Sequence, residues 1–286
     1  MEGHVNKKKK GKSLTTLLLV AMLLIGLALV AYPSVSNWWN EVRSTRAVSN
    51  YQEAVQDMDK TQHALMLDAA HRYNAELSWL HAALLTEEQK PVYERLLNIG
   101  GSGVMGYIDI ERIGVLLPIY HGTSEYVLQK GIGHVEWSSL PVGGESTHCV
   151  LSGHRGLPSA KLFSDLDVLD IGDTFSLVIM DEVFSYEIDQ IRIVEPKEVQ
   201  ELMITPGQDY CTLVTCTPYG VNSHRILARG HRIETEKARQ IRIVSDATRV
   251  SNIIVAPFVA LPLAVLLFVA DRLLTVRRKK ETDTVE

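Results

Sequence analysis

The sequence predicts a mainly β domain, folded as a closed or nearly closed barrel with short helices, preceded by an α-helical region and flanked by two transmembrane helices. Three observations predict this fold class. From residue 106 to residue 233, short runs rich in Ile, Val, Tyr and Thr alternate with Gly, Pro and Asp, as strands and turns do. Over residues 48–84, apolar side chains recur at helical spacings of three, four and seven. Near each end, the chain carries an uncharged apolar run.

Both apolar runs have a basic cluster on their outer side. Residues 17–31 follow five lysines within residues 7–12, and residues 253–270 precede five Lys or Arg side chains. The positive-inside rule then places both termini in the cytoplasm and the part between the runs outside the cell. We therefore predict a cytoplasmic tail (1–12), a transmembrane signal anchor (13–32), a second transmembrane helix (252–270) and a second cytoplasmic tail (271–286).

Each run has an alternative interpretation. The first is also compatible with a cleaved signal peptide, since Gly26-Leu27-Ala28 is an acceptable cleavage site. The second has the length of a buried core helix, although its position near the terminus, its lack of charge and the basic residues after it favour a membrane span.

The charge balance argues against a nucleic-acid partner. The chain has 29 Lys and Arg against 34 Asp and Glu, a net charge of −5. Without the two tails, 19 basic and 29 acidic residues remain, so the extracellular part has a net charge near −10. Binding to DNA or RNA depends on Lys and Arg clustered against phosphate, which this balance does not provide.

Residues 33–99 form the predicted extracellular helical region. Its third and last helix is predicted over 87–97, with Pro91 in the first turn. The run Gly100-Gly101-Ser102-Gly103 then marks the boundary to the barrel domain, residues 100–235, which a linker over 236–251 joins to the second membrane run.

Seven strands are predicted in the barrel domain, over residues 107–110, 114–119, 148–152, 174–180, 184–194, 210–215 and 223–233. Short helical turns are predicted over 124–129, 161–169 and 197–202. Seven or more short strands with small helical insertions favour a barrel over a doubly wound sheet.

The chain has only three cysteines, Cys149, Cys211 and Cys216, which is too few for a disulfide framework. The number is odd, so at least one thiol is free. Cys211 and Cys216 are five apart on one predicted strand, so their side chains point to opposite faces and cannot form a disulfide without distortion. A Cys149–Cys211 disulfide and two buried free thiols both remain open.

Cys216 is the candidate nucleophile. It ends the apolar strand Leu213-Val214-Thr215 and precedes the turn-forming run Thr217-Pro218-Tyr219-Gly220. Its side chain is therefore predicted to lie at a strand end beside a loop. On its own, such a cysteine is more often a small buried apolar residue than a nucleophile. A nucleophilic thiol needs a neighbouring base or cation to raise its thiolate fraction.

His154 is the candidate acid and base among the ten histidines. It follows the apolar run Val150-Leu151-Ser152-Gly153 and precedes Arg155-Gly156, so it lies at a predicted strand end between two glycines. Catalytic side chains are often presented on such loops by a rigid scaffold.

Arg225 is the candidate donor to the oxyanion that develops in acyl transfer. It lies nine residues after Cys216 on the next apolar strand, and the intervening loop is short enough for a hairpin that brings the two strand ends together. By composition alone, a surface strand arginine is the favoured interpretation of Arg225. Neither Asp nor Glu occurs within these motifs, so an orienting carboxylate is not indicated.

These motifs resemble the sortase family. Thr212-Leu213-Val214-Thr215-Cys216-Thr217-Pro218, the later Arg225 and the upstream Leu151-Ser152-Gly153-His154-Arg155-Gly156 are similar to the sortase signature of Thr-Leu-x-Thr-Cys with a following arginine. The runs over 117–123, 139–144 and 157–163 resemble class C, the pilin-polymerising branch. The resemblance covers about residues 100–235.

The resemblance implies an eight-stranded barrel and a cysteine transpeptidase that cleaves a Leu-Pro-x-Thr-Gly-like sorting signal between Thr and Gly. Cys216 would attack the Thr carbonyl, Arg225 would stabilise the oxyanion, and His154 would protonate the leaving amine and deprotonate the incoming one. The implied partners are pilins or surface proteins with a C-terminal sorting signal. The implied location is the membrane of a Gram-positive cell, as a multi-pass protein with an extracellular catalytic domain. No metal or cofactor is implied.

One departure from class C concerns the lid. Class C sortases usually carry an Asp-Pro-aromatic triplet before the barrel, and no such triplet occurs here; the corresponding stretch reads Leu77-Ser78-Trp79-Leu80-His81, then Glu87-Glu88-Gln89-Lys90-Pro91. The sequence therefore predicts an active-site thiol without the usual lid.

Two other functions remain open. A sortase that attaches proteins to the cell-wall precursor would use the same three residues, although the second membrane run favours pilin polymerisation. A non-enzymatic membrane scaffold or receptor ectodomain would carry an inert Cys216.

Overall fold

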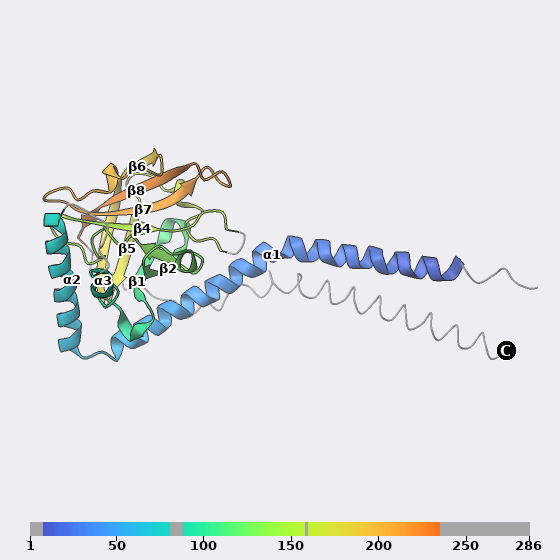
Figure 1. Ribbon diagram of the computed structural model, residues 1–286, viewed down its shortest axis with the longest axis horizontal. Helices are drawn as coiled ribbons and strands as arrows, with labels where there is room; N and C mark the ends of the chain where they lie inside the picture. Colours follow the sequence, from blue (N-terminus) through green and yellow to red (C-terminus); the bar gives the residue numbers. More distant parts are fainter. Residues whose placement is uncertain (1–7, 81–87, 158–159, 235–286) are drawn as a thin grey trace, which may run out of the picture. The chain divides into compact units, whose positions relative to one another are not determined.

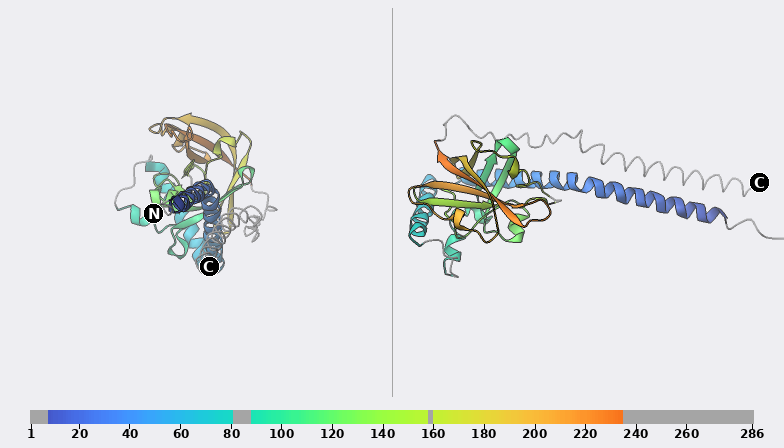
Figure 2. Two further views of the ribbon diagram at one scale, coloured as in Figure 1. Left: turned by 90° about the vertical axis from the view of Figure 1, so that its right-hand side faces the viewer. Right: turned by 90° about the horizontal axis from the view of Figure 1, so that it is seen from above.

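The computed structural model describes residues 8–80, 88–157 and 160–234. Its central feature is a closed eight-stranded barrel, in which the strands follow one another in the order β1-β2-β3-β4-β7-β8-β6-β5 (Figures 1 and 2). Neighbouring strands are antiparallel except for the pairs β2–β3 and β4–β7, which are parallel. The strands are β1 (Val104–Ile110), β2 (Val115–His121), β3 (Ile132–His134), β4 (Thr147–Ser152), β5 (Thr174–Ile179), β6 (Glu182–Val194), β7 (Asp209–Thr217) and β8 (His224–Ile233).

All seven predicted strands are present, and β3 is the eighth. The strand β3 was not predicted because it has only three residues, too few for an alternating pattern to appear, and one of them is Gly133. Glycine is depleted in strands, but here a side chain at 133 would lie 2.4 Å from the carbonyl oxygen of Gly122, so the neighbouring chain leaves room only for hydrogen.

The helical elements are α1 (Lys8–Gln56), α2 (Lys60–Leu80), α3 (Lys90–Tyr93), α4 (Glu125–Leu128) and the short 3-10 helices η1 (Ile99–Gly101), η2 (Glu111–Ile113), η3 (Leu166–Val168) and η4 (Gln200–Leu202). The prediction of a helix over 87–97 was too long. Within the described part of that stretch, only Lys90–Tyr93 is α-helical, and the φ of +58° at Leu97 is incompatible with a right-handed helix. The turn predicted over 161–169 likewise reduces to η3.

The helical region packs against the barrel through buried polar contacts. In α1, the hydroxyl of Tyr51 donates to the carbonyl of Met105, at 2.9 Å, and accepts from the amide of Met180, at 2.7 Å. In α2, which lies beside the barrel in Figures 1 and 2, the Asn74 side chain makes two hydrogen bonds to the backbone of Leu140, at 3.0 and 2.7 Å. Trp39–Val244 accordingly forms one compact unit.

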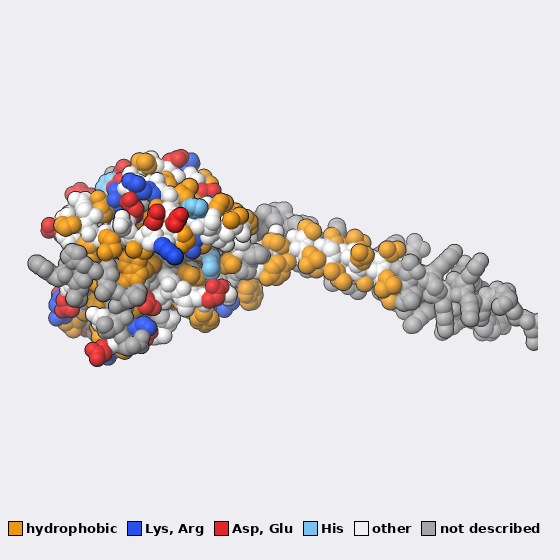
Figure 3. All heavy atoms as spheres, turned by 45° about the horizontal axis from the view of Figure 1, so that its top comes forward, with side chains coloured by type: hydrophobic (Ala, Val, Ile, Leu, Met, Phe, Trp, Pro, Cys, Tyr) orange, Lys and Arg blue, Asp and Glu red, His pale blue; other side chains and the backbone are white. Residues whose placement is uncertain are grey.

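The N-terminal part of α1 has the properties expected of a membrane helix. Among the described residues, α1 is the one helix that is long and apolar enough to span a bilayer. Its most apolar segment has a mean hydropathy of 2.4, and no part of this segment is buried in protein. Figure 3 shows hydrophobic side chains along this segment. The predicted transmembrane segment ends at residue 32, whereas α1 continues through Pro33 to Gln56. The second predicted span, residues 252–270, lies outside the described residues, as does the stretch 81–87 before α3.

Alternate residues of β4, β7 and β8 face two different apolar clusters. Cys149, Leu151, Cys211, Leu213, Ile226 and Ala228 belong to the main core. The residues between them, Val150, Val214 and Leu227, belong to a smaller cluster that also contains Val194 of β6 and Leu202 of η4. We call the sheet face that carries this smaller cluster the outer face. Its position matters because Cys216 is two residues after Val214 and so lies on the same face.

Candidate active site

Cys216 and Arg225 lie directly opposite each other in the antiparallel pair β7–β8. The predicted hairpin is therefore confirmed, and both side chains lie on the outer face because directly opposed residues share a face. Cys216 is a free, half-buried thiol, whereas Cys149 and Cys211 are free and fully buried, opposite each other in β4 and β7. Of the two alternatives for this pair, the structure has the two buried thiols. The guanidinium of Arg225 donates to the carbonyls of Asn222, at 3.0 Å, and His224, at 2.9 Å.

His154 lies at the same end of the barrel as Cys216. The parallel register of β4 and β7 places Ser152 opposite Val214, two residues before His154 and Cys216 respectively. The pairing continues past β4, because the amide of Gly153 donates to the carbonyl of Val214, at 3.0 Å, and the buried hydroxyl of Thr215 donates to the carbonyl of Gly153, at 2.8 Å. The structure thus places the three residues that the sequence singled out at the same end of the barrel.

The glycines on either side of His154 are required by close packing. A side chain at 153 would lie 2.7 Å from the Phe163 ring, and one at 156 would lie 2.7 Å from the Tyr219 ring. Gly156 also has a φ of +75°, which L-residues with side chains rarely adopt. Because Tyr219 belongs to the β7–β8 loop, this contact joins the loop that carries His154 to the loop between Cys216 and Arg225.

Arg155 makes a second connection between these loops. Its Nη1 donates to the hydroxyl of Thr217, at 3.2 Å, and its Nη2 forms an ion pair with Asp167. Its side chain is only 11% exposed, so this contact is shielded from water more than most surface pairs are. Arg155, which follows His154, is thus hydrogen-bonded to Thr217, which follows Cys216. This connecting role of Arg155 was not predicted from the sequence.

Glu125, at the start of α4, is the other residue that sequence reasoning missed. Its Oε2 lies 3.5 Å from Nε2 of His154, within ion-pair range, yet Nε2 makes no hydrogen bond. The amide of Gln129 donates to Oε1 at 2.9 Å. That hydrogen bond is the larger cause, and the charge of His154 the next, of a lowered pKa for Glu125. No motif indicated this contact, because Glu125 is 29 residues upstream of His154.

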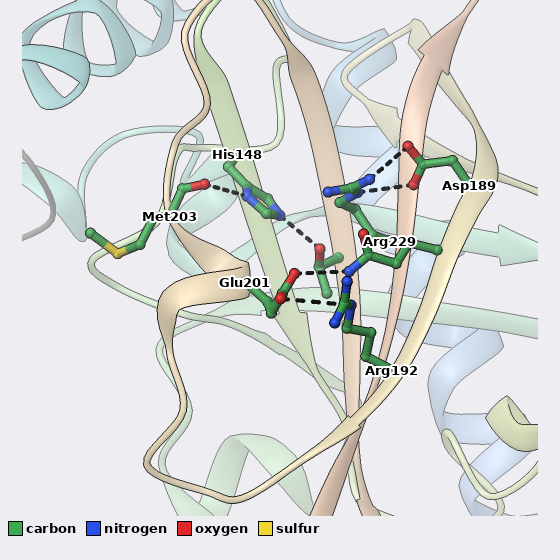
Figure 4. A network of polar contacts seen from close by, with 8 residues as sticks. His148, Asp189, Arg192, Glu201, Met203 and Arg229 are labelled. Carbon is green, nitrogen blue, oxygen red and sulfur yellow. Dashed lines mark hydrogen bonds and ion pairs between the residues drawn. The ribbon is translucent and has the colours of Figure 1, made fainter.

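Further along the outer face, a polar network joins the β6–β7 connection to β4 and β8 (Figure 4). Nδ1 of the buried His148 lies 3.0 Å from the carbonyl of Met203, and Nε2 lies 2.7 Å from the hydroxyl of Thr212. Arg229 donates two hydrogen bonds to Asp189, at 2.9 and 3.0 Å. Glu201 of η4 accepts from Gln190 at 2.8 Å and lies 3.6 Å from Arg192. These contacts fix the connection whose Leu202 covers the small apolar cluster.

The network predicts a pH-dependent stability. Burial, followed by the charge of Arg229, lowers the pKa of His148 below its ordinary 6.5, although the Met203 carbonyl opposes this. As the pH falls below 6.5, His148 in the unfolded chain therefore binds a proton that it does not bind in the folded protein. The contribution of His148 to the free energy of unfolding is thus fully present above this pH and is lost as the pH falls below it. We expect a lower free energy of unfolding at pH 5.5 than at pH 7.5, and a smaller difference in His148→Gln.

The comparison variant for this prediction is His121→Gln. Burial also lowers the pKa of His121, so this variant should remove a separate part of the pH dependence. Unfolding followed by near-UV circular dichroism at both pH values measures these differences. An unchanged pH dependence in His148→Gln would contradict the assignment.

Comparison with known proteins now identifies the family. Residues 108–233 match the family model of the Sortase domain. The crystal structure of sortase C1 from Streptococcus agalactiae is 49% identical and superposes with a TM-score of 0.66, over 67% of this chain and 100% of that one. The chain belongs to the sortase family. Sortase C from Streptococcus pneumoniae is 43% identical, with a TM-score of 0.61 over 66% of this sortase and 97% of that chain.

A more distant relative shares a shorter part of the chain. Sortase D from Bacillus subtilis is 31% identical over 131 residues, which are 45% of this sortase and 63% of that protein. The two sortase C structures confirm the class C resemblance, and sortases are cysteine transpeptidases. The alternative of a non-enzymatic scaffold is not supported.

Proposed function

We propose that this sortase cleaves a Leu-Pro-x-Thr-Gly-like sorting signal between Thr and Gly and joins the released Thr to a lysine amine of a pilin. One observation supports this most: Cys216 lies directly opposite Arg225 on the outer face, and His154 lies at the same end of the neighbouring strand. A thiol, a base and a fork of hydrogen-bond donors are the groups that acyl transfer through a thioester needs.

In the first half of the reaction, the Cys216 thiolate attacks the Thr carbonyl carbon. Negative charge develops on the carbonyl oxygen, and the guanidinium of Arg225 stabilises it. Arg225 already donates to the backbone carbonyls of Asn222 and His224, so the group is oriented at the strand end before substrate binds. The C–N bond breaks, the leaving amine takes a proton from His154, and a thioester remains on Cys216.

In the second half, His154 is neutral and accepts a proton from the incoming lysine amine as that amine attacks the thioester. The C–S bond breaks, an isopeptide bond forms and the Cys216 thiolate returns. An amine acceptor in place of water makes the enzyme a ligase. The same histidine thus serves as acid and then as base, as microscopic reversibility requires.

The small apolar cluster is the proposed floor for the Leu and Pro of the sorting signal. Val214 and Leu227 lie next to Cys216 and Arg225 along β7 and β8, and Leu202 from η4 packs on them. An extended peptide entering the reaction would bury apolar side chains here and present its carbonyl at the strand end.

We also propose that the protein spans the membrane twice, with the barrel outside the cell. The apolar segment of α1 supports the first span, and the second rests on the uncharged run over 252–270 with the basic residues after it. Two spans would confine the barrel to the surface where membrane-held pilins arrive. Such confinement raises the effective concentration of acceptor amine relative to free diffusion.

Attachment of surface proteins to a cell-wall precursor remains the second candidate, because the same three residues would perform it. Polymerisation is favoured by the class C neighbours, of which the Streptococcus pneumoniae enzyme is described in relation to pilin substrate specificity. The products distinguish the two functions. We expect a ladder of pilin-to-pilin isopeptide conjugates on cells, whereas monomers linked only to cell-wall precursor would establish the alternative.

Deletion of residues 252–286 tests the role of the second span. Cleavage of a sorting-signal peptide in solution should stay nearly intact, since the barrel is unchanged, while pilus polymers on cells should become short or absent because the confinement is lost. Peptide turnover and immunoblots of cell-wall extracts measure the two effects. Full-length polymers from the truncated enzyme would contradict the proposed role.

A further inference from the structure

The Nε2 atom of His154 is the unusual feature of the site. It is shielded from solvent and makes no hydrogen bond among the described residues, although the side chain as a whole is 24% exposed. A neutral imidazole carries one N–H and an imidazolium carries two. When His154 is protonated, Nε2 must therefore carry a hydrogen, and this hydrogen needs an acceptor.

Glu125 offers that acceptor. Its Oε2 lies 3.5 Å from Nε2, while its Oε1 is occupied by the amide of Gln129, at 2.9 Å. One carboxylate oxygen of Glu125 thus accepts a hydrogen bond from Gln129, and the other faces His154. The local backbone is fixed as well, since Ser124 caps α4 by accepting from the amide of Val127.

The surrounding cations leave this carboxylate to His154. Lys130, which follows α4, places its ammonium 3.3 Å from the centroid of the Tyr126 ring. Arg155 is engaged with Asp167 and Thr217, and Arg225 with the carbonyls of its own loop. Glu125 on α4 thus supplies a negative charge beside His154, while Cys216 and Arg225 lie on β7 and β8 at the same end of the barrel.

We infer that Glu125 is a positioning residue for His154, accepting a hydrogen bond from Nε2–H and leaving Nδ1 as the nitrogen that exchanges protons with the reacting amines. This inference rests on the proposed function of His154 and adds an orienting carboxylate to it, as the aspartate does in a Ser-His-Asp triad. In the first half-reaction, the proton leaves Nδ1 for the departing amine. In the second, Nδ1 takes a proton from the attacking amine, and Glu125 stabilises the imidazolium that forms.

Glu125→Gln in the full-length enzyme tests the inference. It keeps the size of the side chain and removes its charge. Because Glu125 is 68% exposed, the effect is that of a screened ion pair, so we expect kcat for a sorting-signal peptide to fall by about two- to fivefold with little change in KM. Salt at ~1 M should bring the wild type toward the variant.

Two further variants make the result decisive. Glu145→Gln removes another exposed carboxylate, just before the N-terminal end of β4, and should leave kcat unchanged. His154→Ala should abolish turnover; if it does not, the proposed function itself fails. If His154→Ala is inactive while Glu125→Gln matches the wild type in kcat and salt response, only the role of Glu125 is wrong. A rise in KM at unchanged kcat, or an equal loss in Glu145→Gln, would also overturn it.

Discussion

Cys216→Ala should abolish both peptide cleavage and transfer to an amine, with turnover falling to the limit of detection. Cys216 is the one cysteine that is not fully buried, and it lies opposite Arg225 near the C-terminal end of β7. Without its sulfur, no thioester can form, and neither His154 nor Arg225 can replace the nucleophile. Turnover of a sorting-signal peptide and mass spectrometry of the acylated enzyme measure the loss together.

Cys149→Ala and Cys211→Ala are the matched controls. Both thiols are buried in the main core, so their removal should lower stability by about 1 kcal/mol or more while leaving most of the activity. All three variants lose a thiol, so Cys149→Ala and Cys211→Ala show whether the loss of activity is specific to Cys216 or follows from removing any cysteine. Retained activity in Cys216→Ala would rule out the proposed mechanism.

Arg225→Lys should lower turnover by about 10²–10³-fold, the usual effect of removing one oxyanion donor. The positive charge is kept, but a lysine has a single ammonium in place of a planar fork of donors. In the structure, one nitrogen of this fork, Nη1, donates to the carbonyls of Asn222 in the β7–β8 loop and His224 at the start of β8, which orient the guanidinium at the strand end. A lysine could not make these contacts and stabilise an oxyanion together. Single-turnover kinetics with a sorting-signal peptide would show the loss in the acylation step.

Arg229→Lys is the control on the same strand. Arg229 donates both of its hydrogen bonds to Asp189 and stacks over the Tyr210 ring, with 4.3 Å from its guanidinium carbon to the ring centroid. Its replacement should cost stability, yet leave the acylation rate of the folded enzyme largely unchanged. If Arg229→Lys lost the rate and Arg225→Lys kept it, the assignment of the oxyanion donor would be wrong.

Local pattern was enough to predict the barrel strands and the hairpin of the site. Strands alternate every two residues and end at Gly, Pro and Asp, so seven of the eight were visible. The β7–β8 hairpin was predictable for the same reason, since a short loop between two strands forces their ends together. That placed Cys216 beside Arg225 from spacing alone, as the register confirms.

The sequence was less informative where an element is short or where its contacts are distant in the chain. The strand β3 has three residues, and the predicted helix over 87–97 reduces in its described part to Lys90–Tyr93. The position of His154 relative to Cys216 depends on the parallel pairing of β4 with β7, two strands that are far apart in the sequence. The motif predicted that both residues end strands, but pattern does not specify which strands become neighbours.

By itself, then, the sequence predicted the barrel, the apolar N-terminal helix and the three candidate residues, because each of these predictions depends on residues close together in the chain. The tertiary structure decided what surrounds those residues. Closure of the barrel brings β2, β3 and β4 together, and with them α4, whose Glu125 approaches His154 across 29 positions. It also places Val150, Val214 and Leu227 under Leu202 from η4. Such contacts arise from the packing of whole elements, which no local spacing encodes.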